Sequence, residues 1–209
     1  MARAYTGPLC HYFAGANGEP LTYVSGVEDW RRDLQQAFDA SLVPTLTWRE
    51  DATLPGSWHD LADGGLIALR LFAFYAEKSD LDLPDNVPAL VELDRDYREA
   101  LDAKFARSKY GHLLSARLWL PQDFAFTARI ALPDGDAIEM GSLPVLKDQL
   151  RWLNARTFQA DEEQIATWVG LPAELGGPLL AAAQRGYASL SAAVAEATAR
   201  ALPLVVVEA

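Results

Sequence analysis

The sequence is poor in the residues that form most recognisable catalytic and metal centres. Its 209 residues include one cysteine and three histidines. A single cysteine excludes a disulfide framework and a cysteine-rich zinc module, because both need several thiols at fixed spacings. The chain also lacks a phosphate-binding loop, a dinucleotide fingerprint, a His-Glu-x-x-His motif and a Gly-x-Ser-x-Gly elbow. These absences lower the expectation of the common nucleotide, zinc-protease and hydrolase chemistries.

A long apolar run is missing as well. The longest stretch without a charged side chain is Ala4 to Gly18, and it contains glycine, proline, histidine and asparagine. A membrane-spanning helix needs about 20 predominantly apolar residues. Gly7 and Pro8 also interrupt the apolar core that a signal peptide requires. We therefore expect a cytoplasmic protein that has no membrane partner.

Positive charge is scarce. The sequence has 18 basic and 29 acidic residues, which gives a net charge of −11. A protein this acidic is poorly suited to hold a phosphate backbone, so we expect no nucleic-acid partner. Half of the residues are hydrophobic, which excludes a disordered chain. The length favours a single globular domain over residues 1–209, with only a weak boundary at the loop over residues 79–88.

Periodic apolar residues predict several helices. Residues 66–76 are almost wholly apolar, with Arg70 as the only charge, which indicates a helix buried on all sides. The preceding pair, Gly64 and Gly65, either allows another backbone to approach closely or marks a break. We expect a charged helix with one buried stripe over residues 87–109. An alanine-rich helix over residues 180–201 is expected to pack within the molecule.

The clearest β signal lies over residues 113–141. Two runs, Leu114 to Leu120 and Phe124 to Leu132, alternate apolar and polar residues and are bounded by turn residues, which predicts a hairpin. A third strand near Met140 completes a predicted antiparallel meander. We also expect a helix over residues 29–40, and short strands at residues 21–25, 43–48 and 204–207. The predicted fold is α+β, with helices packed on a small antiparallel sheet.

His59, Asp60 and Asp63 form the best local constellation for catalysis. If residues 57–63 begin a helix, His59 and Asp63 are four residues apart and share a face. An imidazole beside a carboxylate can act as a general base or contribute two metal ligands. The alternative is that His59 lies in the first turn of a helix, where acidic neighbours favour the helix dipole.

Acidic residues are concentrated between Glu77 and Asp102. This segment has nine acidic and three basic residues, a net charge of −6. Acidic side chains on a loop and a helix can steer a basic partner, as in inhibitors of basic enzymes and immunity proteins. Asp94, Asp96 and Asp102 are therefore predicted binding residues. The alternative is a solvated helix face that keeps the protein in solution.

Two tryptophans stand beside arginines. Trp119 and Trp152 are either anchors for a partner or residues that cover a packed face. Cys10 is expected to be buried and inert. A short stretch of the sequence also contains a cluster of four basic residues, Lys104, Arg107, Lys109 and Arg117. This cluster could bind a phosphate or carboxylate, although the helix dipole also favours cations near the end of a helix.

These features support two hypotheses of different class. The first is a non-catalytic binding protein, such as an acidic inhibitor or immunity-type protein, whose partner is a basic protein. The second is an enzyme of unfamiliar, hydrolase-like type that uses His59, Asp60 and Asp63. We favour the first, and we expect no cofactor and no bound metal. Dimerisation through the helix over residues 180–201 is a third arrangement, so the oligomeric state stays open.

Overall fold

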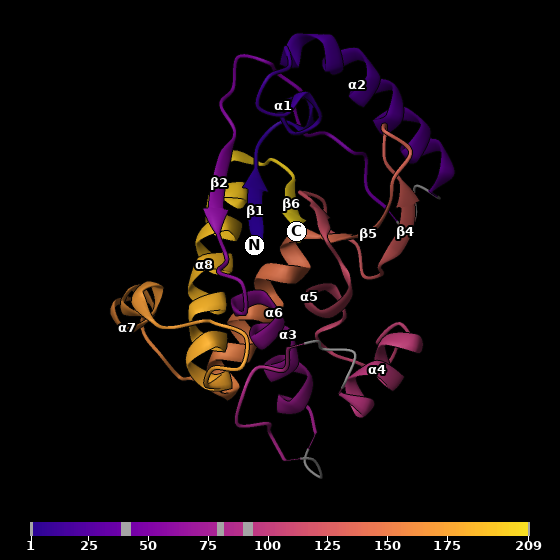
Figure 1. Ribbon diagram of the computed structural model, residues 1–209. Coiled ribbons are helices and arrows are strands. Elements are labelled where there is room, and N and C mark those ends of the chain that lie inside the picture. The colour runs from indigo at the N-terminus through magenta and orange to yellow at the C-terminus, as the bar shows by residue number, and fades with distance from the viewer. Residues whose placement is uncertain (1, 39–42, 79–81, 90–93, 209) are drawn as a thin grey trace.

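The computed structural model describes residues 2–38, 43–78, 82–89 and 94–208. In these residues, eight α-helices surround a six-stranded mixed sheet with the strand order β2-β1-β6-β3-β5-β4 (Figure 1). The predicted α+β class is confirmed. No helix in these ranges is both long and apolar enough to cross a membrane.

The strands are short and the helices vary widely in length. The strands are β1 (Arg3–Thr6), β2 (Ser57–Asp60), β3 (Leu118–Leu120), β4 (Ala128–Ala131), β5 (Ala137–Ser142) and β6 (Leu204–Val207). The helices are α1 (Leu9–Ala14), α2 (Pro20–Ala37), α3 (Gly65–Ala76), α4 (Arg95–Asp102), α5 (Gly111–Ser115), α6 (Leu143–Arg156), α7 (Glu162–Thr167) and α8 (Leu179–Arg200), with a 3₁₀ turn η2 (Trp168–Gly170).

The predicted antiparallel meander is wrong. β4 and β5 do form a hairpin, closed by a turn in which Gly135 has a φ of +90°. However, β5 inserts between β3 and β4 and runs parallel to β3. The seven residues between β3 and β4 are long enough to carry the chain past one strand position. In addition, Leu114 belongs to α5, so the alternating run was only partly a strand.

The sheet is covered on both faces, which explains its alternating side chains. Trp119, Leu204 and Val206 pack against the helices of one core cluster, built mainly from α3, α5, α6 and α8. Leu118 and Val205 belong to a second cluster, which includes residues of α1 and α2. Neighbouring residues of a strand point to opposite faces, so the three central strands β1, β6 and β3 each contribute to both clusters. The predicted strand at residues 204–207 is confirmed as β6, which lies between β1 and β3.

The closest backbone approach in the helical layer joins α3 and α8. Gly65 in α3 faces Gly186 in α8, and a Cβ built on Gly186 would lie 2.0 Å from the carbonyl oxygen of Gly65. The close approach proposed for the Gly64-Gly65 pair is therefore confirmed. The alanine-rich helix predicted over residues 180–201 is α8, and it packs within the molecule.

Arg70 is the one charged residue of α3 and is almost fully buried. Its guanidinium donates to the carbonyl oxygens of Leu113 (3.1 Å) and Ala116 (2.8 Å), which lie at the end of α5. It also forms an ion pair of 2.8 Å with Glu208, just after β6. A single buried cation thus ties α3 to α5 and to the last strand.

The first fifty residues differ from the prediction. Residues 21–25 belong to α2 and not to a strand, and α2 begins nine residues before the predicted helix at 29–40. Residues 39–42 lie outside the described residues. Residues 43–48 form no strand, contrary to the prediction, and pair with no described strand. Their backbone is held by side chains instead, since Gln35 accepts a hydrogen bond of 2.7 Å from the Leu46 amide.

The buried carboxylate of Glu50 caps the N-terminus of α1. It accepts hydrogen bonds of 3.0 Å from the amides of Leu9 and Cys10, at the helix N-terminus, and one of 2.5 Å from the Trp48 indole. The two amides are among the N–H groups that any helix leaves unpaired at its first turn. Cys10 is fully buried, as expected. Burial, followed by the charge of Glu50 and its hydrogen bond, raises the pKa of the thiol to about 12.

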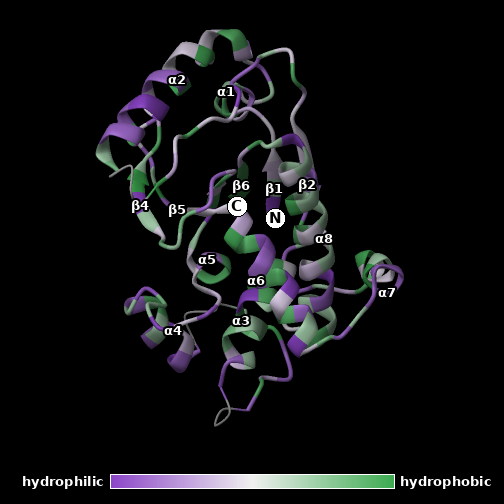
Figure 2. Cartoon of the chain, turned by 180° about the vertical axis from the view of Figure 1, so that it is seen from behind, coloured by the Kyte–Doolittle hydropathy of each residue, from purple (hydrophilic) through white to green (hydrophobic). Residues whose placement is uncertain are grey.

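The predicted helix over residues 87–109 is much shorter. α4 spans Arg95–Asp102, and residues 90–93 lie outside the described residues. Figure 2 shows the contrast between α4, in which hydrophilic residues dominate, and the hydrophobic α3. The chain leaves α4 through a Schellman-type end: the Phe105 amide donates to Ala100 and the Lys104 amide donates to Leu101, both at 2.8 Å. This end produces the turn over residues 103–109, which borders two cavities.

Candidate functional site

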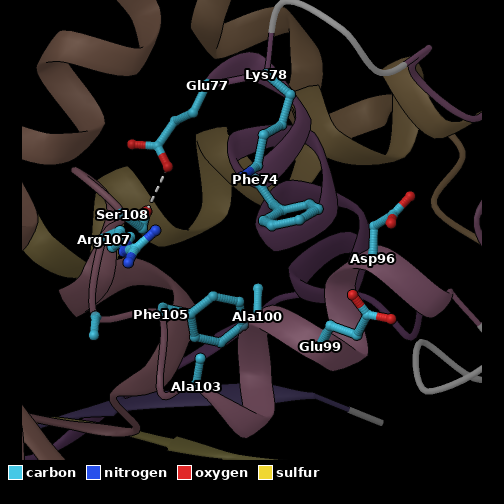
Figure 3. Close-up of a pocket in the computed structure, with 11 residues that line it drawn as sticks. Phe74, Glu77, Lys78, Asp96, Glu99, Ala100, Ala103, Phe105, Arg107 and Ser108 are labelled. Carbon is cyan, nitrogen blue, oxygen red and sulfur yellow. Dashed lines mark hydrogen bonds between the residues drawn. The ribbon is translucent and has the colours of Figure 1, made fainter.

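A cavity of about 460 Å³ lies between the end of α3, α4 and the 103–109 turn (Figure 3). We call it the acidic pocket. Its apolar lining includes the rings of Phe74 and Phe105, with Ala100 and Ala103 beside them. Its polar lining consists of Glu77, Lys78, Asp96, Glu99, Arg107 and Ser108. The volume lies within the range of small-molecule sites, and an aromatic surface beside carboxylates can receive an organic cation.

Aromatic packing holds the pocket in shape. The Phe74 and Phe105 rings both contact Tyr97 of α4 edge-on, at centroid distances of 5.4 and 5.2 Å. Phe105 is buried although its φ is +49°, a left-handed conformation that is costly for a bulky residue. Because its ring is locked between α3 and α4, this packing offsets the backbone cost and keeps the turn against both helices.

Two of the acidic residues near the pocket have structural partners. Glu77 accepts hydrogen bonds from the Ser108 hydroxyl (2.7 Å) and the Lys109 amide (2.5 Å), so it fastens the turn to α3. Asp94 is the N-cap of α4: it accepts from the Tyr97 amide at 2.9 Å and from the Tyr75 hydroxyl at 2.7 Å. Burial, then the hydrogen bond with Asp94, raises the pKa of Tyr75.

The predicted binding residues of the acidic segment therefore separate into different roles. Asp94 builds the helix, whereas Asp96 lines the acidic pocket from an exposed position. Asp102 is exposed on the same helix but does not line the pocket. Glu99 also lines it and forms an exposed ion pair of 3.0 Å with Arg95. The acidic residues at positions 80 and 92 lie outside the described residues.

The helix predicted to join His59 to Asp63 does not exist. Residues 57–60 form β2, an edge strand paired with β1, and α3 begins only at Gly65. Adjacent residues on a strand face opposite sides, so His59 and Asp60 point apart. Asp60 accepts a hydrogen bond of 2.8 Å from the Ala62 amide. A catalytic role for these residues stays a prediction, but its helical geometry is wrong.

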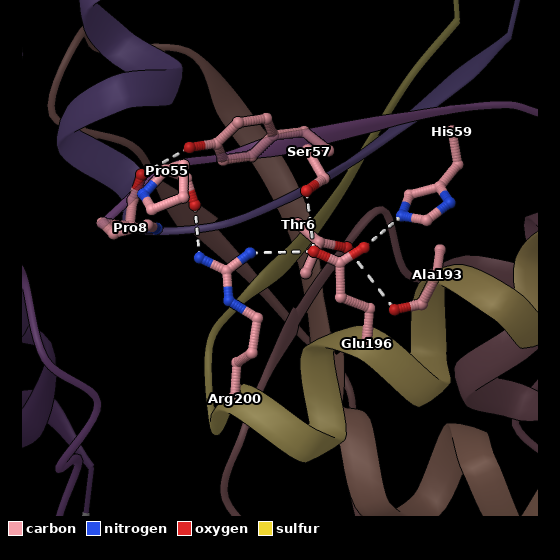
Figure 4. A network of polar contacts seen from close by, with 9 residues as sticks. Thr6, Pro8, Pro55, Ser57, His59, Ala193, Glu196 and Arg200 are labelled. Atoms are coloured by element: carbon pink, nitrogen blue, oxygen red, sulfur yellow. Dashed lines mark hydrogen bonds and ion pairs between the residues drawn. The ribbon is translucent and has the colours of Figure 1, made fainter. Parts of the chain in front are cut away.

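His59 instead meets Glu196 of α8 (Figure 4). The Glu196 carboxylate contacts His59 Nε2 at 3.0 Å and accepts from Ser57 (2.7 Å) and from Arg200 (2.8 Å). Arg200 also donates to the carbonyl of Pro55. The serine hydroxyl thus donates to the carboxylate and not to the imidazole, so the order required for a serine nucleophile is absent from this cluster. The network fastens the edge strand to α8.

Glu196 makes folding sensitive to acid. Burial alone would raise its pKa, but hydrogen bonds from Ser57, Arg200 and His59 outweigh that effect and lower it. The unfolded chain therefore takes up the proton first as the pH falls, and the stabilisation is lost below the ordinary glutamate pKa of about 4.3. We expect Glu196→Gln to be less stable than the wild type at pH 7 and to lose less stability between pH 6 and the acid limit.

Denaturant melts across this pH range measure the difference. Glu99→Gln is the matched control, because Glu99 is an exposed helix residue and its ion pair is 61% and 81% exposed. Wild type and Glu196→Gln losing stability in parallel as the pH falls would show that this carboxylate is not responsible.

The two predicted tryptophan anchors lie in different surroundings. Trp119 is fully buried and donates to the carbonyl of His112 at 3.0 Å, which corresponds to the packing alternative. Trp152 is half-buried in α6, with Lys109 Nζ at 5.0 Å and the Arg156 guanidinium at 5.3 Å from its ring. Its role in binding a partner stays a prediction.

Among the described residues, no group of three or more His, Cys, Asp or Glu side chains is arranged to hold a metal ion.

Sequence reasoning missed Glu196 and Phe74, because neither carries a local signal. Each becomes notable only through contacts made across the fold.

Comparison of the chain with protein-family models, with curated proteins and with solved structures found no match.

Proposed function

We propose that this chain is a non-catalytic binding protein that receives a basic side chain of a protein partner in the acidic pocket. The observation that carries the proposal is the juxtaposition of the Phe74 and Phe105 rings with the exposed carboxylates of Asp96 and Glu99. A guanidinium or ammonium group gains from an aromatic face and from a carboxylate together, and both gains grow where water is excluded.

The pocket already holds one cation of its own. Lys78 Nζ lies 5.1 Å from the centroid of the Phe74 ring. This contact supports the proposal, because it places an ammonium group on the same aromatic floor. Phe74 is only 3% exposed, so a basic side chain from a partner would have to displace Lys78 to reach its ring, on which the planar group of an arginine can stack.

Geometry has to supply most of the selectivity. The pocket is lined by three acidic residues and two basic ones, Lys78 and Arg107, so its net charge is only −1. A diffuse negative field is therefore insufficient to select a basic side chain, and the selectivity depends on the positions of Asp96 and Glu99. A built site predicts a dependence of binding on these two positions, whereas a solvated acidic helix face does not.

We expect Asp96→Lys and Glu99→Lys each to weaken binding of an arginine-containing peptide by about tenfold or more, the equivalent of 1.4 kcal/mol. The probe is a short synthetic peptide with one arginine, titrated into the labelled protein while the backbone amide shifts of residues 100–105 are followed. Asp102→Lys is the matched control: it makes the same charge change on the same helix outside the pocket lining. It should change the dissociation constant by less than about twofold.

A peptide with citrulline in place of arginine keeps the shape and removes the charge. Equal binding of the two peptides, or an equal loss in Asp96→Lys and Asp102→Lys, would overturn the proposal. The first outcome would show that the pocket does not recognise the charge of the arginine, and the second would show only a general electrostatic field.

The hydrolase-like alternative has less support. Glu196 accepts a hydrogen bond from the Ser57 hydroxyl, but its lowered pKa makes it a weak base, and His59 makes no hydrogen bond to that hydroxyl. A loss of any detected hydrolytic activity in His59→Ala, with folding intact, would revive this alternative.

A further inference from the structure

A second cavity, of about 610 Å³, lies on the other side of the 103–109 turn. We call it the basic cavity. It is bounded by this turn, α5, α6 and the β4–β5 hairpin with the segment that leads into it. Three basic side chains line it, Lys104, Lys109 and Arg129, against one carboxylate, Glu139. It is therefore opposite in charge to the acidic pocket, although the two cavities share residues of the turn.

A buried histidine lies at the inner end of this cavity. His112 is only 4% exposed, and its Nδ1 accepts a hydrogen bond of 2.9 Å from the Ser142 amide. In a neutral imidazole the other nitrogen then carries the hydrogen, so Nε2–H is a donor. Burial lowers the pKa of His112, which keeps the ring neutral at pH 7. Gly141 makes this position possible, because a Cβ there would lie 2.9 Å from Nδ1.

The Nε2–H donor is buried, and no described residue accepts a hydrogen bond from it. The Ala125 carbonyl is close enough to raise the pKa against the effect of burial, but it does not meet the N–H with hydrogen-bond geometry. Residues 125–127 line the cavity beside the ring. A buried donor without an acceptor is destabilising, so an added oxygen atom at this point is stabilising.

Lys104 occupies a position at which glycine would be less costly. It is the residue after the cap of α4 and has a φ of +53°, and a left-handed conformation at this point of a Schellman motif usually belongs to glycine. A lysine in this left-handed conformation is strained. The helix dipole favours a cation here, but only weakly at an exposed position. The Lys104 side chain leaves this position to line the basic cavity.

We propose that the basic cavity binds a small anionic ligand through phosphate or carboxylate oxygens. Lys104 and Arg129 supply the positive charge. The buried His112 Nε2–H supplies a neutral donor, which the ligand reaches when residues 125–127 move aside. Lys109 contributes less, because its ammonium group already lies over Trp152. The site is independent of the acidic pocket, whose lining includes none of Lys104, Arg129 and His112.

Lys104→Gly gives a sharp test, because it removes the charge and relieves the strain together. We expect the variant to be at least as stable as the wild type, yet to bind inorganic phosphate about tenfold more weakly. Lys147→Ala is the matched control: it removes one lysine from α6 outside the lining of the basic cavity and should bind as the wild type does. Imidazole nitrogen shifts of His112 and amide shifts of residues 125–129 follow the titration.

Citrate in a parallel titration separates a phosphate site from a carboxylate site. Saturable shifts at His112 with either probe, lost in Lys104→Gly and retained in Lys147→Ala, support the proposal. Shifts that never saturate, or an equal loss in both variants, would overturn it, and so would binding that leaves the His112 nitrogens unchanged.

Discussion

Replacing Gly186 with alanine is expected to reduce the free energy of unfolding by about 2–4 kcal/mol. The new Cβ would lie 2.0 Å from the carbonyl oxygen of Gly65 and 2.5 Å from its carbonyl carbon, so α3 and α8 must separate. Overpacking of side chains typically costs 1–3 kcal/mol, and a backbone obstacle yields less readily than a side chain. The helix preference of alanine returns only about 1 kcal/mol. Thermal or denaturant unfolding, followed by circular dichroism, measures the loss.

Two other glycines make this prediction specific. Gly26 lies in α2 with nothing within 4 Å of an added Cβ, so Gly26→Ala should stabilise the protein by roughly 0.5–1 kcal/mol. Gly65→Ala would place its Cβ 3.3 Å from the Gly186 Cα, a tight but tolerable contact, and should cost less than Gly186→Ala. Gly186→Ala unfolding at the same denaturant concentration as the wild type would contradict the close approach of the two helices.

Arg70→Met is the second change with a large expected effect, about 3–5 kcal/mol. Methionine fills much of the volume of the arginine stem, but it leaves the carbonyl oxygens of Leu113 and Ala116 without their donor. Buried acceptors that lose a partner carry the full desolvation cost. Removal of one member of a buried charged network has costs of this size.

Glu208→Gln separates the two parts of the Arg70 network. It removes the negative charge from the ion pair but leaves both carbonyl contacts, and its side chain is 37% exposed. We expect a loss of less than about 1 kcal/mol, because partly exposed ion pairs contribute little. Equal losses in Arg70→Met and Glu208→Gln would mean that the ion pair, and not the capping of α5, is the stabilising contact.

Local patterns predicted α3, α8 and the last strand well, but they failed where distant segments decide. The alternation in residues 113–141 indicates β structure, yet strand order depends on which neighbour each strand finds. β5 pairs with β3 through a register, Leu118 with Met140, that no short stretch of sequence encodes. Likewise, the Gly64-Gly65 pair predicted a close approach, but its partner Gly186 lies more than 120 residues away.

The candidate site was predicted in part, for similar reasons. Charge counting located Asp96 because acidity is a local property of the sequence. It could not separate Asp96 from Asp94, whose carboxylate is used by the helix cap and by Tyr75. The helix start predicted at residues 57–63, on which His59 and Asp63 would share a face, does not form, because residues 57–60 pair with β1 instead. The basic cavity collects residues from separate stretches of the chain, 104–112, 125–129, 139 and 145–149, so only the basic residues Lys104 and Lys109 stood out beforehand.

The burial of Cys10 has a practical consequence. It is the only cysteine, it is fully buried, and its thiol is almost entirely protonated at neutral pH. A thiol reagent can therefore modify it only while α1 is detached from Glu50 and the sheet. The rate of labelling in native buffer measures how often this corner of the molecule opens, without any added probe or mutation. The chain thus carries a built-in reporter of local opening, far from both cavities in sequence.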